Sequence, residues 1–247
     1  MRHFAPNAVD EMLARPSRIH FICAVNKEDV FERVLLRSLE QNRYASLTKV
    51  VGAGSAAEAF NPHVGKHPRD GITVLVHQDV YLPPGWTDRM EAIFDHTVFG
   101  VAGCVGATSA GFFADVYASP NHYLDFNIDS LPAPVDSLDE LLLAFPSNTP
   151  IRLSPELGWH MYGAEACTLA QMHGLPALAI RNQVAHLCLR ENYEPSADLT
   201  FLRSARAYFA KYRRPVKTTM TFIDADGNLV FPTGHVLLAS TALPTPT

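Results

Sequence analysis

A strand-like apolar run that leads directly into a polar cluster is the feature that most constrains how this chain can fold. Residues 72–76 read Ile-Thr-Val-Leu-Val, and His77, Gln78 and Asp79 follow at once, before a Pro-Pro break. Continuous apolar strands are typical of parallel sheets that are covered on both faces. In open α/β sheets, ligands lie just outside the carboxyl ends of such strands. The pattern predicts a ligand or metal site at Asp79; the structural alternative is that Asp79 caps the next turn or pairs with an arginine.

Strand and helix patterns alternate along the rest of the chain. Apolar residues at helical spacing predict a helix over residues 28–40, with Glu28 and Asp29 in the first turn, where the helix dipole favours negative charge. The other predicted elements are strands at 19–25, 47–51, 72–76, 99–105, 140–145 and 178–185, helices at 55–60, 86–94, 164–173 and 197–213, and a hairpin at 219–231. This order indicates an α/β fold with a mostly parallel, twisted sheet that is flanked by helices.

The same patterns divide the chain into a main domain and an extension. We expect the main domain to span residues 18–190. Residues 191–238 are expected to add a C-terminal helix and a β-hairpin that pack on the same domain, with Asp226-Gly227 as the turn. Residues 106–120 are expected to form a glycine-rich loop, residues 121–135 a surface segment, and residues 239–247 a flexible tail.

Charge and composition argue against several classes of protein. The formal net charge is -5 and the pI is about 6.1, which disfavours a broad nucleic-acid surface. Residues 1–17 lack the apolar segment of a signal peptide, and no run approaches the roughly 20 apolar residues of a membrane span. The cysteines form no C-x-x-C pair and are interpreted as reduced core thiols. We expect a cytoplasmic protein without a nucleic-acid partner; its oligomeric state stays open, a homo-oligomer included.

The end of the first predicted strand, Ala24-Val25-Asn26, is a candidate nucleotide site. A backbone edge there can hold a base or a ribose, and Asn26 can donate or accept hydrogen bonds. The structural alternative is a strand-to-helix turn in which Asn26 caps the helix. No G-x-G-x-x-G or P-loop pattern is present, so a dinucleotide site of the Rossmann type and a P-loop are disfavoured.

Two later residues are candidates for chemistry. Glu165 lies near the start of a predicted helix, where a carboxylate is favoured and could take a proton from an acceptor hydroxyl. A helix-start glutamate without a role is the alternative. His186 follows a predicted strand and could bind a metal ion, and a buried structural histidine is the alternative. The acidic residues 136–140 either face a cleft or form a solvated loop, and residues 224–228 are better explained by a hairpin turn than by a calcium loop.

Taken together, the motifs resemble a bacterial family, the glycosyltransferase-like domains first associated with streptomycin-cluster proteins, which are a branch of the family 2 glycosyltransferases. The resemblance covers about residues 18–188, and its most specific motif is the segment from His77 to Leu82. The other matching segments are residues 21–28, 56–61, 100–103, 135–140 and 160–165, with Trp86 and His186.

This resemblance implies a GT-A nucleotide-sugar fold and a set of residue roles. Asp79 would hold Mn²⁺ or Mg²⁺ on the donor diphosphate with His186 on the metal side, and His77 stands where a D-x-D motif has its first Asp. Glu165 would be the base of an inverting transfer. The donor-binding residues would be Ala24, Val25, Asn26, Asn61, His77, Gln78 and Asp79. The acceptor residues would be Trp159, His160 and Tyr162.

The predicted function is transfer of a sugar from a nucleotide-diphosphate sugar to a hydroxyl of a saccharide or another acceptor, with inversion. One alternative is a degenerate module that binds a nucleotide sugar without turnover. A second alternative is a metal-dependent hydrolase built from His77, Asp79, His160 and His186. Tight zinc binding by three protein ligands at an open site would favour the hydrolase.

Overall fold

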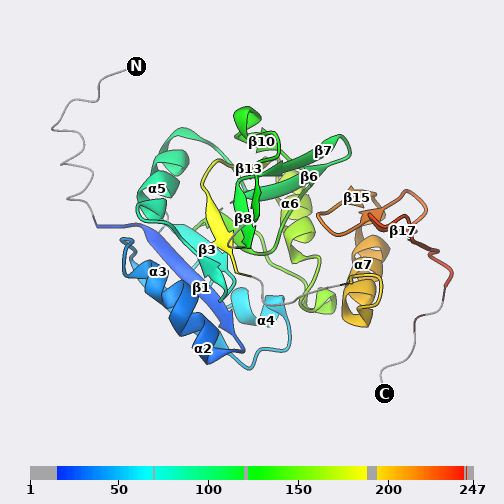
Figure 1. Cartoon of the computed structure of the whole chain (residues 1–247), viewed down its shortest axis with the longest axis horizontal. Helices are drawn as coiled ribbons and strands as arrows, with labels where there is room; N and C mark the ends of the chain where they lie inside the picture. Colours follow the sequence, from blue (N-terminus) through cyan, green and yellow to red (C-terminus); the bar gives the residue numbers. More distant parts are fainter. Residues whose placement is uncertain (1–15, 69, 120–121, 188–193, 242, 244–247) are drawn as a thin grey trace.

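Figure 1 shows the computed structural model of the chain, which describes residues 16–68, 70–119, 122–187, 194–241 and 243. A seven-stranded sheet with the order β10-β13-β5-β12-β3-β1-β2 lies at its centre. The strands are β1 (Ile19–Val25), β2 (Ser46–Val51), β3 (Ile72–Val76), β5 (Val101–Gly103), β10 (Ala133–Pro134), β12 (Leu142–Pro146) and β13 (Ala177–Ala179). Only β10 and β12 run against the others in this sheet, so it is mostly parallel, as predicted from the sequence.

Each face of the central sheet has its own apolar core. Alternate residues of one strand point to opposite faces, so that Phe21 and Val74 enter one core while Ile22 and Leu75 enter the other. Helices α2, α3 and α5 cover the first face, and α4 and α6 cover the second (Figure 1). Their bounds are α2 (Glu28–Phe31), α3 (Arg37–Leu39), α4 (Ala56–Phe60), α5 (Trp86–His96) and α6 (Tyr162–Met172). β3 is buried along its whole length because both faces are covered, which confirms the strand prediction.

Two of the predicted elements, the helix at residues 28–40 and the strand at residues 178–185, differ from their predictions. Between α2 and α3 the chain winds as a π-helix over Glu32–Leu36. The single strand predicted at residues 178–185 is wrong, because the chain leaves the central sheet after β13 and re-enters a second sheet as β14 (Val184–His186). Asn182 lies at this break and is bonded to Trp86. The side-chain amide of Asn182 donates to the backbone carbonyl of Trp86 at 3.2 Å, and the backbone carbonyl of Asn182 accepts the Trp86 indole N–H at 3.2 Å.

The expectation that residues 106–120 form a loop is also wrong. They form short strands, of which β8 belongs to a four-stranded sheet with the order β4-β14-β8-β9. Gly106 permits close packing, since a Cβ atom there would lie 2.8 Å from Val135 Cγ1. Residues 120–121 lie outside the described residues. The short strands in and around this segment are β4 (Val80–Tyr81), β6 (Val105–Thr108), β7 (Gly111–Ala114), β8 (Val116–Ser119), β9 (His122–Leu124) and β11 (Ser137–Leu138).

The C-terminal region adds a third core. Helix α7 (Leu199–Tyr212) packs against an antiparallel sheet of two-residue strands at one end of the molecule (Figure 1). The strands are β15 (Val216–Lys217), β16 (Phe222–Ile223), β17 (Leu229–Val230) and β18 (Val236–Leu237). Residues 1–15 and most of the tail expected after residue 239 lie outside the described residues. No helix in the described part of the chain has the length and hydrophobicity needed to cross a membrane.

A stacked pair of histidines lies near the amino ends of β1 and β3, away from the carboxyl ends. The rings of His20 and His67 are parallel within 5°, with centroids 3.8 Å apart. Burial, and then the charge of His67, lowers the pKa of His20; burial, and then the charge of His63, lowers that of His67. His20 Nδ1 hydrogen-bonds with Ser46 Oγ at 2.8 Å, whereas the buried Nε2 of His67 makes no hydrogen bond in the described structure. Both imidazole rings are therefore neutral in the folded protein at neutral pH.

Acidification should destabilise the protein through this pair. A base whose pKa is lower in the folded state binds more protons when unfolded, so the free energy of unfolding falls as the pH drops below the ordinary histidine value of about 6.5. Unfolding in urea between pH 5 and 8 should show this fall, and His67→Gln should make it shallower. An unchanged pH slope in His67→Gln would assign the effect to other groups.

Candidate functional site

A short strand pairing brings three ligand-type side chains together. His77 follows β3, Asp79 precedes β4, and His186 is the last residue of β14. β4 and β14 pair antiparallel with His186 opposite Val80, and the Leu187 N–H donates to the Asp79 carbonyl at 2.8 Å. The pairing fixes His186 beside Asp79, at the carboxyl end of β3, where the sequence predicts a ligand site.

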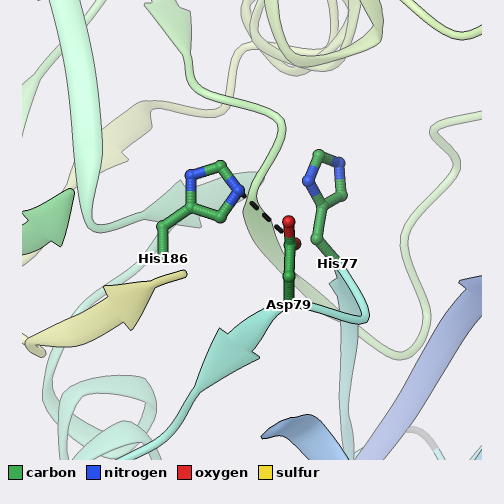
Figure 2. Close-up of side chains that lie close together, drawn as sticks. All are labelled: His77, Asp79 and His186. Carbon is green, nitrogen blue, oxygen red and sulfur yellow. Dashed lines mark ion pairs between the residues drawn. The ribbon is translucent and has the colours of Figure 1, made fainter. Parts of the chain in front are cut away.

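The three side chains are half-buried and could hold a metal ion. Their ligand atoms all lie within 4.8 Å of one another. His186 Nε2 lies 3.4 Å from Asp79 Oδ1, and the ring centroids of His77 and His186 are 5.8 Å apart. Figure 2 shows the two rings on either side of the Asp79 carboxylate, each with a nitrogen turned toward the space between them. Two imidazole nitrogens and one carboxylate oxygen form a donor set for divalent transition metals that leaves coordination positions for other ligands.

The titration of each group depends on its neighbours. Burial, and then the charge of His186, lowers the pKa of His77. Burial alone would raise the pKa of Asp79, but the hydrogen bond and charge of His186 outweigh it and the pKa falls. Burial alone would lower the pKa of His186, but the bond to Asp79 raises it. His77 is therefore neutral, and a cation at this site would compete with the proton on His186.

Tyr162 fixes the tautomer of His77. The Tyr162 hydroxyl lies 2.9 Å from His77 Nε2 and donates its proton to the Glu140 carbonyl at 3.0 Å. Burial, and then the charge of Glu140, raises the pKa of Tyr162, so the hydroxyl keeps this proton. Because that single proton is used, the Tyr162 oxygen must accept from His77 Nε2–H, which leaves Nδ1 of His77 unprotonated and able to bind a metal. Tyr162 is 2% exposed and contacts His77, and the acceptor role expected for it stays a prediction.

The residues expected at the nucleotide lie at the end of β1, beside the cluster. Gln78 Oε1 accepts the backbone N–H groups of Asn26 and Lys27, each at 3.0 Å, and Gln78 Nε2 donates to Asn26 Oδ1 at 2.6 Å. Ala24 is half-buried and Val25 is buried. The side chains of Gln78 and Asn26 are therefore hydrogen-bonded to each other. Because Gln78 lies between His77 and Asp79, these bonds fix the loop after β1 next to the cluster.

The side chain of Asn61 hydrogen-bonds with the backbone of Leu153. Its amide donates to the Leu153 carbonyl at 2.7 Å, and its carbonyl oxygen accepts the Leu153 N–H at 2.8 Å. This pairing joins the end of α4 to the segment before α6. Asn61 therefore has both ends of its amide engaged with the backbone of Leu153.

Trp159 and His160 lie beside α7. Trp159 is 39% exposed and helps line a pocket of about 280 Å³. His160 Nε2 lies 3.2 Å from Thr200 Oγ1, and its ring meets that of Phe201 at a centroid distance of 5.6 Å. His160 is thus not among the three residues of the cluster. The pocket is lined by Gly54, Glu156, Leu157, Gly158, Trp159, Thr200, Arg203 and Ser204.

Glu165 lies in a buried polar network that ties α7 to the core. Its side chain is fully buried. Glu165 Oε2 accepts the Ser154 N–H at 2.7 Å, and Oε1 accepts the Ser154 hydroxyl and the Tyr212 hydroxyl, the latter at 2.7 Å. Lys211 Nζ lies 3.4 Å from the same Oε1. None of these partners belongs to the cluster of His77, Asp79 and His186, so the role of Glu165 as a general base stays a prediction.

One other carboxyl group acts on the cluster directly, and a second acts on Tyr162 beside it. Asp139 is half-buried, its charge raises the pKa of both His77 and His186, and its Oδ2 accepts the Thr219 hydroxyl at 2.7 Å. Burial, and then the charge of Asp139, raises the pKa of Glu140 to about 8. The acidic run 136–140 was visible in the sequence, but only the fold shows that it reaches the cluster.

Comparisons with known proteins show only weak likeness. No family model matches the sequence, and no curated protein matches it. The chain is similar to the crystal structure of GalNAc-T7 with UDP, GalNAc and Mn²⁺, at 12% identity and a TM-score of 0.47, over 78% of this chain and 48% of that chain. It is similar to A197 from STIV at 12% identity and a TM-score of 0.41, over 93% and 98% of the two chains. The chain spans about half the length of the GalNAc-T7 chain.

Removal of the Tyr162 hydroxyl should weaken metal binding without unfolding the protein. Tyr162→Phe frees His77 to adopt the other tautomer, and loss of such an outer partner costs about 10- to 100-fold in metal affinity. Titration calorimetry with Mn²⁺ would measure the change. Tyr208→Phe is the matched control, because it removes a buried tyrosine hydroxyl that hydrogen-bonds with Thr168, at 2.6 Å, rather than with the cluster. Equal affinities in the two variants would contradict the role of Tyr162.

Substitution of Glu165 should reduce stability. Glu165→Gln removes the charge from an oxygen that accepts two hydroxyl protons and faces Lys211, and it should lower the free energy of unfolding by about 2 kcal/mol. Urea unfolding would measure this loss. Glu156→Gln, which changes the more exposed partner of Lys211, should have little effect. Unchanged stability in Glu165→Gln would argue against the anchoring role.

Proposed function

We propose that this chain is a glycosyltransferase of GT-A type that uses a nucleotide-diphosphate sugar. The observation that carries the proposal is the convergence of His77, Asp79 and His186 at the carboxyl end of β3. Ligands of open α/β sheets lie at this edge, and a cation there can bind a diphosphate. The motifs that resemble family 2 glycosyltransferases include two of these residues in their predicted metal roles, Asp79 and His186.

The donor atoms favour Mn²⁺ over Mg²⁺. Mg²⁺ prefers oxygen ligands, whereas imidazole suits later divalent metals. Two of the three ligands here are imidazoles, so His77 and His186 select against Mg²⁺ while Asp79 supplies one negative charge. When bound, the cation would supply Lewis-acid stabilisation of the charge that develops on the departing nucleoside diphosphate.

The nucleotide would lie along the ends of β1 and β3. Ala24, Val25 and Asn26 would form its base or ribose edge, with Gln78 holding this loop at a fixed distance from Asp79. Asn61 would contribute indirectly, since its side chain is bonded to the Leu153 backbone. The acceptor would enter from the side of Trp159 and His160, where a pocket with an exposed indole suits a sugar ring.

The general base would be a carboxylate that an acceptor can reach. Asp139 is half-buried, whereas Glu165 is fully buried, so we favour Asp139; the acceptor hydroxyl would take the place of the Thr219 hydroxyl on its Oδ2. Glu165, the base predicted from the sequence, would first have to give up its bonds to Ser154 and Tyr212. Inversion follows if the base acts directly on the acceptor hydroxyl.

One competing function has a specific observation in its favour. Two histidines and one carboxylate with open coordination positions also match the ligand count of zinc hydrolases. The sequence alternative included His160 as a ligand, but His160 is not among the residues whose ligand atoms meet in the cluster, and its ring contacts Thr200 and Phe201 of α7. Phosphatase or esterase activity with zinc, without transfer, would favour the hydrolase, and donor binding without any turnover would favour a degenerate binding module.

A thermal-shift screen tests the proposal directly. Wild-type protein is heated with UDP, GDP, CDP and dTDP and their sugars, with and without Mn²⁺. One nucleotide at 100 times its dissociation constant should stabilise the protein by about 2.7 kcal/mol, and only with Mn²⁺. Asp79→Asn and His186→Ala should lose this shift, whereas His173→Ala, an exposed histidine outside the cluster, should keep it. No shift with any nucleotide would overturn the proposal.

A further inference from the structure

The C-terminal extension places a hydroxyl on Asp139, the carboxylate that we favour as the general base. Strands β15 and β16 pair antiparallel, and residues 218–221, named the 218–221 turn here, connect them. Within this turn the Thr218 N–H donates to the Thr221 carbonyl at 2.8 Å. The turn carries the Thr219 hydroxyl, which donates to Asp139 Oδ2 at 2.7 Å.

Both carboxylate oxygens of Asp139 accept a hydrogen bond from the protein. Oδ1 accepts the backbone N–H of Leu141 at 3.1 Å, and Oδ2 accepts the Thr219 hydroxyl. The first bond is local, whereas the second joins the main domain to the C-terminal extension. Asp139 and Thr219 are both half-buried. The Thr219 hydroxyl thus makes the bond that an acceptor hydroxyl must make before it can lose its proton to Oδ2.

The segment that carries Asp139 is bonded to the metal cluster. The His77 N–H donates to the Leu141 carbonyl at 3.0 Å, and the Leu141 N–H donates to Asp139. The charge of Asp139 raises the pKa of both His77 and His186. The bond between Asp139 and Thr219 therefore lies next to the cluster, where the C-terminal extension meets the main domain.

Other contacts hold the 218–221 turn against the main domain. Ser137 Oγ donates to the Lys217 carbonyl at 2.5 Å, and Lys217 Nζ lies 4.7 Å from the centre of the Phe112 ring. Strands β15 and β16, on either side of the turn, are anchored in the third core. Docking of the extension therefore does not depend on the bond of Thr219 alone, and this bond is available for another role.

We infer that Thr219 is a positioning residue that keeps water from the base Asp139 until an acceptor binds. This inference rests on the proposed function and deepens it. A nucleotide sugar at the cluster can be attacked by water as well as by the acceptor, and an active site that excludes water prevents this side reaction. An acceptor makes contacts of its own with the protein and can displace the Thr219 hydroxyl, whereas a water molecule gains little more than the one bond to Oδ2.

The reaction that Thr219 suppresses is hydrolysis of the donor. The oxygen of water forms a bond to the anomeric carbon, and the bond between that carbon and the diphosphate oxygen breaks. The electron pair leaves with the nucleoside diphosphate, and a proton of the water passes to Asp139. Loss of the Thr219 hydroxyl opens Oδ2 to water, so this hydrolysis should become faster.

Release of nucleoside diphosphate without an added acceptor tests the inference. The full chain is incubated with Mn²⁺ and UDP-glucose, UDP-N-acetylglucosamine, GDP-mannose or dTDP-glucose, and the product is measured by ion-exchange chromatography. Thr219→Ala should raise the rate about tenfold, the worth of a hydrogen bond to a charged group. Thr219→Ser keeps the hydroxyl and should bring the rate back to that of the wild type. Met220→Ala changes a side chain of the same turn that is 39% exposed, and it should leave the rate unchanged.

The outcomes separate this inference from the proposed transferase. Asp139→Asn, added to Thr219→Ala, should remove the increase, because the base is then absent. A slower reaction in Thr219→Ala, or an equal increase in Met220→Ala, would overturn the inference, since either result would show a structural role of the turn. A Mn²⁺-dependent thermal shift with a nucleotide, together with equal hydrolysis by wild type and Thr219→Ala, would overturn the inference alone. No shift with any nucleotide would overturn the proposed function, and the inference with it.

Discussion

The pairing of β4 with β14 is the interaction on which the candidate site depends. Asp79 lies on the segment that leaves the central sheet, and His186 lies on a strand that returns to a different sheet. The backbone bond from Leu187 to the Asp79 carbonyl and the register of His186 with Val80 hold the two side chains together. Without this ladder, the cluster would lack one of its two imidazoles.

Polar contacts around the cluster determine its chemistry. Tyr162, at the start of α6, fixes the tautomer of His77, and Gln78 holds the loop after β1. Helix α6 also carries Glu165, which anchors α7 through Tyr212 and Lys211. Two side chains of helix α6 therefore have different roles. Tyr162 orients the imidazole of His77, and Glu165 joins the C-terminal region to the core.

Much of this arrangement could be predicted from the sequence. The apolar run of β3 and its polar ending identified Asp79, because continuous burial requires a sheet covered on both faces. His186 was a candidate from its place after a strand, but the strand boundary was wrong, since the contact of Asn182 with Trp86 breaks the chain there. The contacts of Tyr162 with His77 and of Asp139 with Thr219 join segments that are far apart in the sequence. No local pattern encodes such contacts, so both residues were visible in the sequence but these contacts were found only with the fold in hand.

The central claim is that His77, Asp79 and His186 bind one divalent cation. The most direct measurement is electron spin-echo envelope modulation of the protein loaded with one equivalent of Mn²⁺, which detects nitrogen nuclei bound to the ion. The account predicts modulation from two imidazole nitrogens in the wild type and from one in His186→Ala. Bound Mn²⁺ without nitrogen modulation, or no bound Mn²⁺ at all, would contradict it.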